Sequence, residues 1–445
     1  MRRPDKGPYS NLPDDMLNQT LSLGLRRFTP IALLAFLAAS VASAAWQTLD
    51  WSDADHKKMG RALNKFFGEK TSEKDREKAR AEIVGDLEKF GKKRGIKDPE
   101  EAVQAALASH LDLGKALGYS SEAKNVRGGK AAALKAEFGG ETFEYALQLP
   151  AAYKPSGPAL PLVLCLPGMR DGKPLAPMTF LQDDLHEPAL RDGAAIAVVG
   201  MPVEAELWSV LESDGRKGGL FAAMAVFRDV STSVSIDFDR VYVLGREQGV
   251  PAAMVLGAKY PHLFAGIAGL AGDTGEIGAA NFCNLPTFLQ GGANSAKFEE
   301  DAKQLGYSNC TIKPDATVAD LWSWMGQTTR AANPAKIVIA PEPLQVFKAY
   351  WLMFPKTEGL QGTVTATADR STNTIKIDSE EVRSVTLYLN DAIVDLSKPI
   401  TFVLNGHNQQ QKVARSVDDM LGLISRGTSD PGRVFVAQIT LDIPR

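Results

Sequence analysis

A short turn in the middle of the chain carries the first residues that could do chemistry. Residues 245–249 read Gly-Arg-Glu-Gln-Gly and lie between a strand-like run and a helix-like run. Gly245 and Gly249 have the spacing of a G-x-S-x-G turn, in which the central serine is a nucleophile. Glu247 takes the place of that serine. Because carboxylates can also form covalent intermediates, Glu247 is the first candidate for a catalytic residue.

The elements that must position this turn are short apolar runs that alternate with helical patterns. The runs cover residues 161–166, 194–201, 240–244, 264–270 and 287–290. Alternation at this spacing predicts a parallel sheet covered by helices on both faces. Such sheets place their sites at the carboxyl ends of the strands. The turns after Leu166, Leu244 and Gln290 are therefore where chemistry is expected.

The segments on either side of this part have a different character. Residues 53–119 are rich in Lys, Glu and Ala and include a helix start at Asp98-Pro99, which predicts a helical region. Gly, Ala and Lys in residues 128–136 indicate a linker. From residue 363 onward, β-branched runs separated by Asn, Asp, Gly and Ser predict a mostly antiparallel β-sandwich. The predicted divisions are 1–44, 45–135, 136–358 and 359–445.

The N-terminal division has the features of a secretory signal peptide. Arg26-Arg27 precedes an apolar run over residues 31–41, and small residues follow as far as Ala44. Cleavage is predicted after Ala44, with export to the periplasm or the exterior. The run is short for a bilayer span, which needs about 20 apolar residues. Contact with a membrane is expected only if the signal stays uncleaved, which remains an alternative.

Composition limits the classes of partner. The chain has 445 residues, 44% hydrophobic and 23% charged, with a formal net charge of −3, as is ordinary for a folded protein of two or three packed units. No overall basic field exists to bind nucleic acid or an anionic membrane surface, so a small molecule or a protein is the expected partner. No metal-ligand spacing, phosphate-binding loop or nucleotide fingerprint is visible, so no metal or cofactor is expected.

The three cysteines fit an exported protein without forming a disulfide framework. Cys165 lies inside an apolar run and is expected to be buried and inert. Cys283 and Cys310 remain as a candidate disulfide pair, which the sequence alone does not settle.

Three features together resemble a known superfamily. Residues 236–245 read Ile-Asp-Phe-Asp-Arg-Val-Tyr-Val-Leu-Gly, the turn has the glycine spacing given above, and residues 260–266 read Tyr-Pro-His-Leu-Phe-Ala-Gly. They resemble the α/β-hydrolases, particularly exported prolyl-oligopeptidase-like and polyhydroxybutyrate-depolymerase-like esterases. The resemblance covers residues 143–353 and implies a three-layer α/β-hydrolase fold with a Ser-His-Asp triad. The helical leader and C-terminal β segment also look like exported bacterial members.

The resemblance implies that the triad has been replaced. Glu247 stands at the nucleophile position. The acid normally follows in a Gly-x-x-Asp turn, and the corresponding run over residues 291–294 ends in Asn294. The histidine position falls near Lys313 in residues 311–315, which contain no histidine. The residues expected to carry the site are thus Glu247, Asn294 and Lys313.

The resemblance also implies an oxyanion hole. Its donors would be the backbone N–H of Gln248 and those of the loop containing Gly168 and Met169, although Pro167 stands where the family usually has histidine. A carboxylate beside these donors would occupy the hole or repel an anionic transition state. Alternatively, Arg246 or Lys313 could pair with the Glu247 carboxylate and leave an inert ion pair in place of the triad.

A general base is also missing from the sequence of the site. No histidine occurs between His262 and His407, and His186 is the only one expected to be able to approach the turn. Without a base, Glu247 could attack a substrate once and then stall.

The sequence therefore predicts a catalytically impaired hydrolase homologue that binds a ligand or a protein. The alternatives are an active ester or peptide hydrolase that uses Glu247 or a displaced base, and a purely structural envelope component. An open pocket at Glu247 would favour ligand binding or catalysis, whereas a filled cleft with an apolar patch on the β unit would favour a protein partner.

Overall fold

The structure is a computed structural model that describes most of the chain after residue 50. The described residues are 51–68, 70–120, 126–200, 208–213, 216–341, 343–355, 362–426 and 430–444. The predicted signal peptide and its cleavage site lie outside them. Within these ranges, no helix is both long enough and apolar enough to cross a bilayer.

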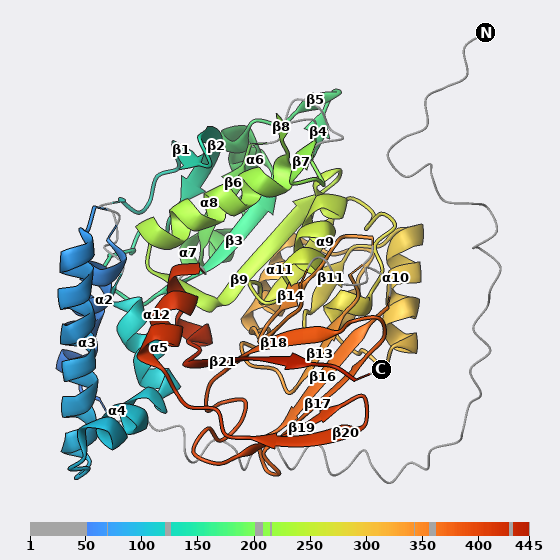
Figure 1. The fold of residues 1–445 in the computed structure, drawn as a ribbon. Helices are drawn as coiled ribbons and strands as arrows, with labels where there is room; N and C mark the ends of the chain where they lie inside the picture. The colour runs from blue at the N-terminus through green and yellow to red at the C-terminus, as the bar shows by residue number, and fades with distance from the viewer. Residues whose placement is uncertain are drawn as a thin grey trace. The chain divides into compact units, whose positions relative to one another are not determined.

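An eight-stranded sheet forms the centre of the fold (Figure 1). Its strands are β1 (Ala132–Phe138), β2 (Glu141–Gln148), β3 (Leu160–Leu166), β6 (Ala195–Val199), β9 (Ile236–Arg246), β10 (Gly266–Leu270), β11 (Thr287–Leu289) and β12 (Cys310–Ile312). The order is β1-β2-β6-β3-β9-β10-β11-β12. β2 is antiparallel to both neighbours, and the strands from β6 to β12 are parallel. The predicted mixed α/β fold with a mostly parallel central sheet is confirmed.

Helices cover both faces of this sheet and make it the middle layer of three. One face packs against α8 (Gly219–Ser233), α9 (Gly249–Lys259) and α10 (Ala293–Gln304), and the other against α6 (Pro177–Asp183), α7 (Pro188–Gly193) and α11 (Val318–Gly326). Successive residues of β3 alternate between the two cores, with Leu164 in the first and Val163 and Cys165 in the second. A strand buried on both faces must be apolar throughout, which explains the runs in the sequence.

The segment predicted as a linker, residues 128–136, is partly a strand. β1 begins at Ala132 and pairs with β2, from Ala132 opposite Leu147 to Phe138 opposite Glu141. The Gly-Ala-Lys composition concealed the strand because β1 lies at the edge of the sheet and buries few of its side chains. The prediction of a linker was wrong for the part of the segment that lies in β1.

The helical region consists of four helices. They are α2 (Asp53–Phe67), α3 (Glu73–Lys93), α4 (Pro99–Leu107) and α5 (His110–Gly118). The predicted start at Asp98-Pro99 is confirmed, because the Asp98 side chain accepts a hydrogen bond from the Glu101 N–H at 2.8 Å. Ile83, Leu87 and Phe90 on α3 enter a hydrophobic core that also contains residues of the C-terminal β part.

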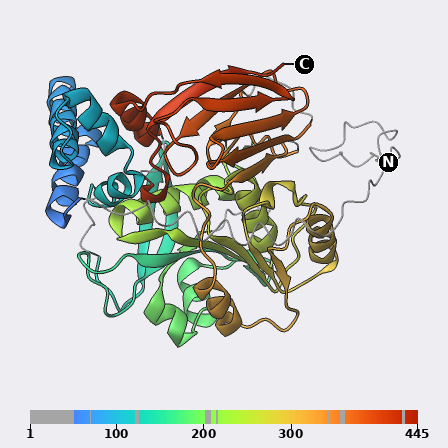
Figure 2. The same ribbon diagram turned by 90° about the horizontal axis from the view of Figure 1, so that it is seen from below.

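The C-terminal part contains two sheets that share this core (Figure 2). One sheet has the order β13 (Lys336–Ile339), β16 (Val364–Asp369), β17 (Thr374–Ser379), β19 (Ile400–Leu404), β20 (His407–Gln411), and the other β14 (Lys348–Ala349), β15 (Leu352–Met353), β18 (Ser384–Leu389), β21 (Ala437–Asp442). The pairings are antiparallel apart from β17 with β19. β13, β14 and β15 belong to these sheets, although their residues fall in the range predicted for the α/β part. The helix α12 (Val417–Arg426) packs on the same core.

The remaining short elements lie in loops. They are the pairs β4 (Met169–Arg170) with β5 (Lys173–Pro174) and β7 (Glu212–Ser213) with β8 (Arg216–Lys217), and the 3₁₀ turns η4 (Ala280–Phe282) and η5 (Pro431–Arg433).

All three cysteines are free thiols, so the candidate pair Cys283 and Cys310 does not form a disulfide. The two thiols have different neighbours: Thr287 lies beside Cys310, and Tyr307 beside Cys283. Cys165 is fully buried on β3 as expected, and this burial raises the pKa of its thiol.

Candidate functional site

Glu247 lies at the tip of the turn between β9 and α9. Its φ angle is +50°, in the left-handed region that residues other than glycine seldom adopt. The Glu247 N–H donates to the Leu270 carbonyl at 3.1 Å, and the Glu247 carbonyl accepts from the Val250 N–H at 3.1 Å. These two bonds hold the residue at the carboxyl edge of the sheet, between the ends of β9 and β10.

The glycines around this turn are required by close backbone approach. A Cβ atom on Gly249 would lie 1.9 Å from the Leu166 carbonyl oxygen, and one on Gly168 would lie 2.6 Å from the Glu247 Oε2 atom. At Gly245, a Cβ atom would lie 2.4 Å from the Gly249 carbonyl oxygen. The end of β3, the turn and the first residues of α9 are therefore packed with no room for a methyl group.

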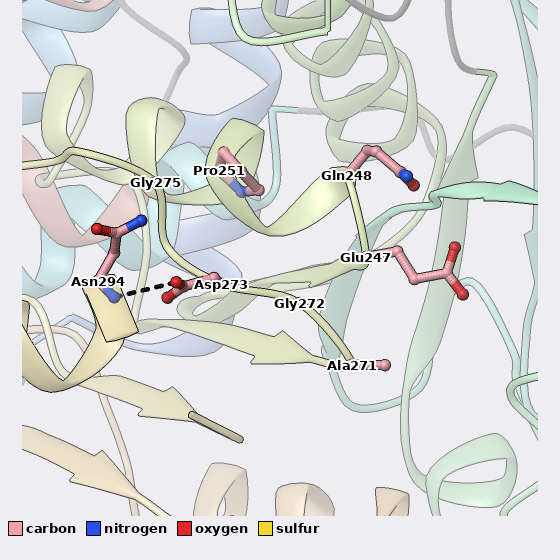
Figure 3. A pocket seen from close by; sticks show the side chains of 8 residues that line it. All are labelled: Glu247, Gln248, Pro251, Ala271, Gly272, Asp273, Gly275 and Asn294. Atoms are coloured by element: carbon pink, nitrogen blue, oxygen red, sulfur yellow. Dashed lines mark hydrogen bonds between the residues drawn. The ribbon is translucent and has the colours of Figure 1, made fainter. Parts of the chain in front are cut away.

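An open pocket of about 440 Å³ lies beside the turn, at the ends of β9, β10 and β11 (Figure 3). It is lined by Glu247, Gln248, Pro251, Ala271, Gly272, Asp273, Gly275 and Asn294. This volume falls within the ordinary range for small-molecule sites. Two of the three turns singled out from the sequence, those after Leu244 and Gln290, thus contribute to one pocket.

The Glu247 carboxylate points away from Asp273 and Asn294 in this pocket, so the predicted acid position does not face it (Figure 3). The cations expected as its partners pair elsewhere. Arg246 forms an ion pair with Asp184 at 3.2 Å, and the Lys313 ammonium with Asp320 at 2.6 Å. An inert ion pair between Glu247 and either of these residues is not present.

Arg170, on β4, is a cation that lies close enough to Glu247 for the Glu247 charge to affect its pKa. Its guanidinium bonds with Asp183 at 2.9 Å and Asp184 at 3.1 Å. The hydrogen bond that Arg170 donates to Asp183, followed by the charges of Asp184, Asp183 and Glu247, raises the pKa of Arg170. Arg170 lies in the loop predicted to supply an oxyanion donor, but its side chain was not predicted as a site residue.

One predicted oxyanion donor is already used within the chain. The Met169 N–H donates to Oε1 of the Gln248 side chain at 2.9 Å. Gly168, the other residue of that loop, lies against the Glu247 side chain. The oxygen of a substrate would therefore have to displace the Gln248 amide before it could bind the Met169 N–H.

Asp273 is a pocket residue that the sequence analysis missed. It follows β10 and accepts hydrogen bonds from the Asn294 N–H at 3.0 Å and from the N–H and hydroxyl of Ser295 at 2.7 Å. Burial by itself would raise the pKa of Asp273, but these donors outweigh it and the pKa is lowered. Its position directly after a predicted strand was the available signal. Asp273 holds the first turn of α10, and Asn294 contributes its backbone to this contact.

The histidines do not supply a base to this pocket. The exposed His186 ring lies 3.1 Å from the carbonyl oxygen of Asp183, through Nδ1. His262 is buried beyond the end of α9, roughly 15 Å along the helix from the turn. Its burial, followed by the charges of Arg433, Lys348 and Arg330, lowers its pKa well below the ordinary range. The other histidines are His56 and His110 in the helical region and His407 on β20.

Within the described residues, no group of three His, Cys, Asp or Glu side chains could hold a metal ion.

The strain at Glu247 leads to a stability prediction. A left-handed residue with a Cβ atom costs about 1–2 kcal/mol, a cost that glycine avoids. Because both substitutions remove the same carboxylate, Glu247→Gly is expected to be about 1 kcal/mol more stable than Glu247→Ala. Urea denaturation of the two variants measures this difference. A Glu247→Gly variant less stable than Glu247→Ala would contradict a left-handed turn.

Comparisons with known proteins find structural neighbours only. No protein-family model and no curated protein matches the chain. A thermostable esterase is similar over 45% of this chain and 63% of its own, at 15% identity and TM-score 0.36, so this chain spans less than two thirds of that esterase. An S-formylglutathione hydrolase from Staphylococcus aureus is similar over 44% of this chain and 99% of its own, at 9% identity and TM-score 0.33. A ferulic acid esterase is similar over 45% and 96%, at 12% identity and TM-score 0.34.

Proposed function

We propose that the protein is an exported α/β-hydrolase homologue that has lost acyl-hydrolase chemistry and binds a ligand in the pocket at Glu247. The observation that carries the proposal is the hydrogen bond from the Met169 N–H to the Gln248 side chain. The chain's own amide takes a donor that a substrate oxyanion would need, at a turn that presents a carboxylate instead of a hydroxyl.

The chemistry around the turn supports a loss of turnover. Acyl transfer needs a nucleophile, a base that activates it and donors that stabilise the oxyanion. Glu247 requires no proton removal to attack, but the resulting ester intermediate would need a base to activate water. Lys313 is engaged by Asp320, and the Asp273 carboxylate is used by the backbone of α10. Neither is positioned to act as that base.

The pocket itself supports ligand binding. It is open, and its lining residues include Glu247, Gln248, Asp273 and Asn294. The Gln248 amide oxygen and the Asp273 carboxylate already accept hydrogen bonds within the chain, so the Glu247 carboxylate and the Asn294 amide carry the polar contacts proposed for a ligand. Carboxylate and amide oxygens accept hydrogen bonds, so a ligand rich in N–H or O–H donors fits this lining better than an anion does.

The alternative function is a hydrolase that uses Glu247. The observation that favours it is the left-handed φ angle of Glu247, because strained residues next to open pockets often belong to catalytic sites. We rank it second because the arrangement provides no base and no free Met169 donor.

Turnover of short acyl esters and aminoacyl arylamides tests the proposal. The wild-type protein and Glu247→Ala are expected to show no turnover above the reaction without protein, with both shown to be folded by circular dichroism. Gln248→Ala, which frees the Met169 N–H, is expected to remain inactive because it restores no base. Multiple turnovers by the wild type that disappear in Glu247→Ala would overturn the proposal and make Glu247 catalytic. Turnover that persists equally in Glu247→Ala would overturn it in favour of a displaced site.

A further inference from the structure

Three cations from distant parts of the sequence gather on the four-stranded C-terminal sheet. Lys348 lies on β14, Arg426 ends α12 and Arg433 ends η5. Two aromatic rings join them: the Lys348 ammonium lies 5.1 Å from the ring centroid of Tyr388, and the Arg433 guanidinium 5.5 Å from that of Phe435. The centroids of the two rings are 6.1 Å apart. We call Lys348, Arg426 and Arg433 the cationic cluster.

Two carboxylates lie near this cluster, Asp430 and Asp419, and neither is at ion-pair distance from Lys348 or Arg426 among the described residues. Asp430 bonds with the buried Arg330 at 2.8 Å and lies 3.9 Å from Arg433. Arg330 takes Asp239 as a second partner at 2.8 Å. Asp430 therefore neutralises the charge of Arg433 only in part. On α12, Asp419 accepts a hydrogen bond from the Gln438 amide at 3.0 Å.

The cluster itself retains donor capacity and positive charge. Arg433 donates through Nη2 to the Tyr350 carbonyl at 2.7 Å, while its buried Nε has no hydrogen-bond partner among the described residues. Among the described residues, Arg426 donates to neutral groups, the Gly422 carbonyl at 3.0 Å and the Gln438 amide oxygen at 3.5 Å. Within the described ranges, Lys348 has no carboxylate at ion-pair distance. Two positive charges, those of Lys348 and Arg426, are thus left without a matching anion.

This arrangement is costly for Lys348. Its own burial, followed by the charges of Arg433 and Arg426, lowers the pKa of its ammonium to about 8. Burying a charge without a partner is unfavourable, and a protein relieves that cost by neutralising the group or by binding a counter-ion. A ligand that carries two negative charges would match the two unmatched cations.

We propose that Lys348, Arg426 and Arg433 form a binding site for a compact dianionic oxyanion of the phosphate or sulfate type. Arg433 supplies a guanidinium held by its bond to the Tyr350 carbonyl, and Lys348 and Arg426 supply positive charge. The site lies in the C-terminal β part and is independent of the function proposed for the pocket at Glu247.

The proposal has a defined pH dependence. A bound anion favours the charged ammonium and raises the pKa of Lys348 above its value in the free protein. Affinity should therefore be complete below pH 8, where Lys348 is charged in both states, and should fall as the pH rises above 8. Burial lowers the pKa of Arg433 to about 10, so the pH series ends below that value, and the lowered pKa of Asp430 keeps its carboxylate ionised throughout. Sulfate suits the pH series because it stays dianionic throughout.

Thermal denaturation of the full chain with inorganic phosphate and with sulfate, at constant ionic strength in chloride, tests the site. Saturable stabilisation is expected for the wild type and for the control Lys376→Met, since Lys376 is an exposed lysine that pairs with Asp378 at 2.6 Å. Lys348→Met and Arg426→Gln should bind at least tenfold more weakly, each compared with its own melting temperature without anion. Both anions also stabilise proteins non-specifically, so a non-saturating rise in the wild type would overturn the proposal. Equal titrations for the wild type and Lys348→Met would overturn it too.

Glycerol 3-phosphate, titrated alongside, distinguishes the source of the anion. Tighter binding than inorganic phosphate would support the site with a phosphomonoester as its ligand. Equal or weaker binding would support the site with the free anion as its ligand.

Discussion

Replacing Arg330 by methionine is expected to destabilise the protein by about 3 kcal/mol, because it breaks a buried ion pair by removing one partner. The Arg330 side chain is fully buried and bonds with Asp430 from the C-terminal part and Asp239 from β9. It also donates to the His262 carbonyl at 3.1 Å. Its loss leaves the buried Asp430 carboxylate with Arg433 alone, at 3.9 Å. Urea denaturation measures the change.

The matched control is Arg240→Met. Arg240 pairs with Asp237 at 2.7 Å, but both side chains are substantially exposed, at 42% and 31%. Such surface pairs contribute roughly 0–1 kcal/mol. Similar losses in the two variants would contradict a special role for the Arg330 network.

Acidification provides a second readout of the same network. Burial alone would raise the pKa of Asp430, but the charge and hydrogen bonds of Arg330 outweigh it, so the pKa is lowered. The stability contributed by a carboxylate with a lowered pKa is complete above its unfolded value of about 4 and is lost as the pH falls through its folded value. The wild type should therefore lose more stability than Arg330→Met as the pH falls below about 4.

Gly249→Ala is the second substitution with a large expected effect, again about 3 kcal/mol of destabilisation, from overpacking. The new Cβ atom would lie 1.9 Å from the Leu166 carbonyl oxygen and 3.0 Å from that of Pro167. Both are backbone atoms at the end of a central strand and cannot move aside as a flexible side chain would. The higher helix propensity of alanine, about 1 kcal/mol, does not offset this clash.

Gly85→Ala is the control for that substitution. Gly85 lies inside α3, and a Cβ atom there would meet no heavy atom within 4 Å. Alanine should stabilise this helix by about 1 kcal/mol. Urea denaturation should therefore show opposite signs for the two variants, and a loss of stability in both would contradict the packing argument.

The fold could be predicted from the sequence where the information is local. The runs that became β3, β6, β9, β10 and β11 were visible because strands buried on both faces must be apolar along their whole length. β1 was missed because an edge strand does not require an apolar sequence. The residues of β13 could not be assigned to a sheet, since a short apolar strand fits either sheet equally well and its pairing with β16 is a long-range contact.

The sequence predicted the backbone turn of the candidate site but not the side-chain contacts around that turn. The spacing of Gly245 and Gly249 indicated a tight strand-to-helix turn, and the structure has Glu247 at its tip. The partners of the side chains around it were not predictable. Gln248 reaches back to Met169, and Asp273 binds the start of α10. These contacts join loops that follow different strands of the sheet.

The sequence by itself thus determined the alternation of strands and helices, the composition of the flanking parts and the tight turn at Glu247, because periodicity and backbone sterics act over a few neighbouring residues. Only the tertiary structure decided which charges meet: Arg246 with Asp184, and Arg330 with both Asp239 and Asp430, across sequence separations that no local pattern spans. The energy of an ion depends on its distance to other charges and on its burial, and both are set by the order of the strands and the packing of the loops.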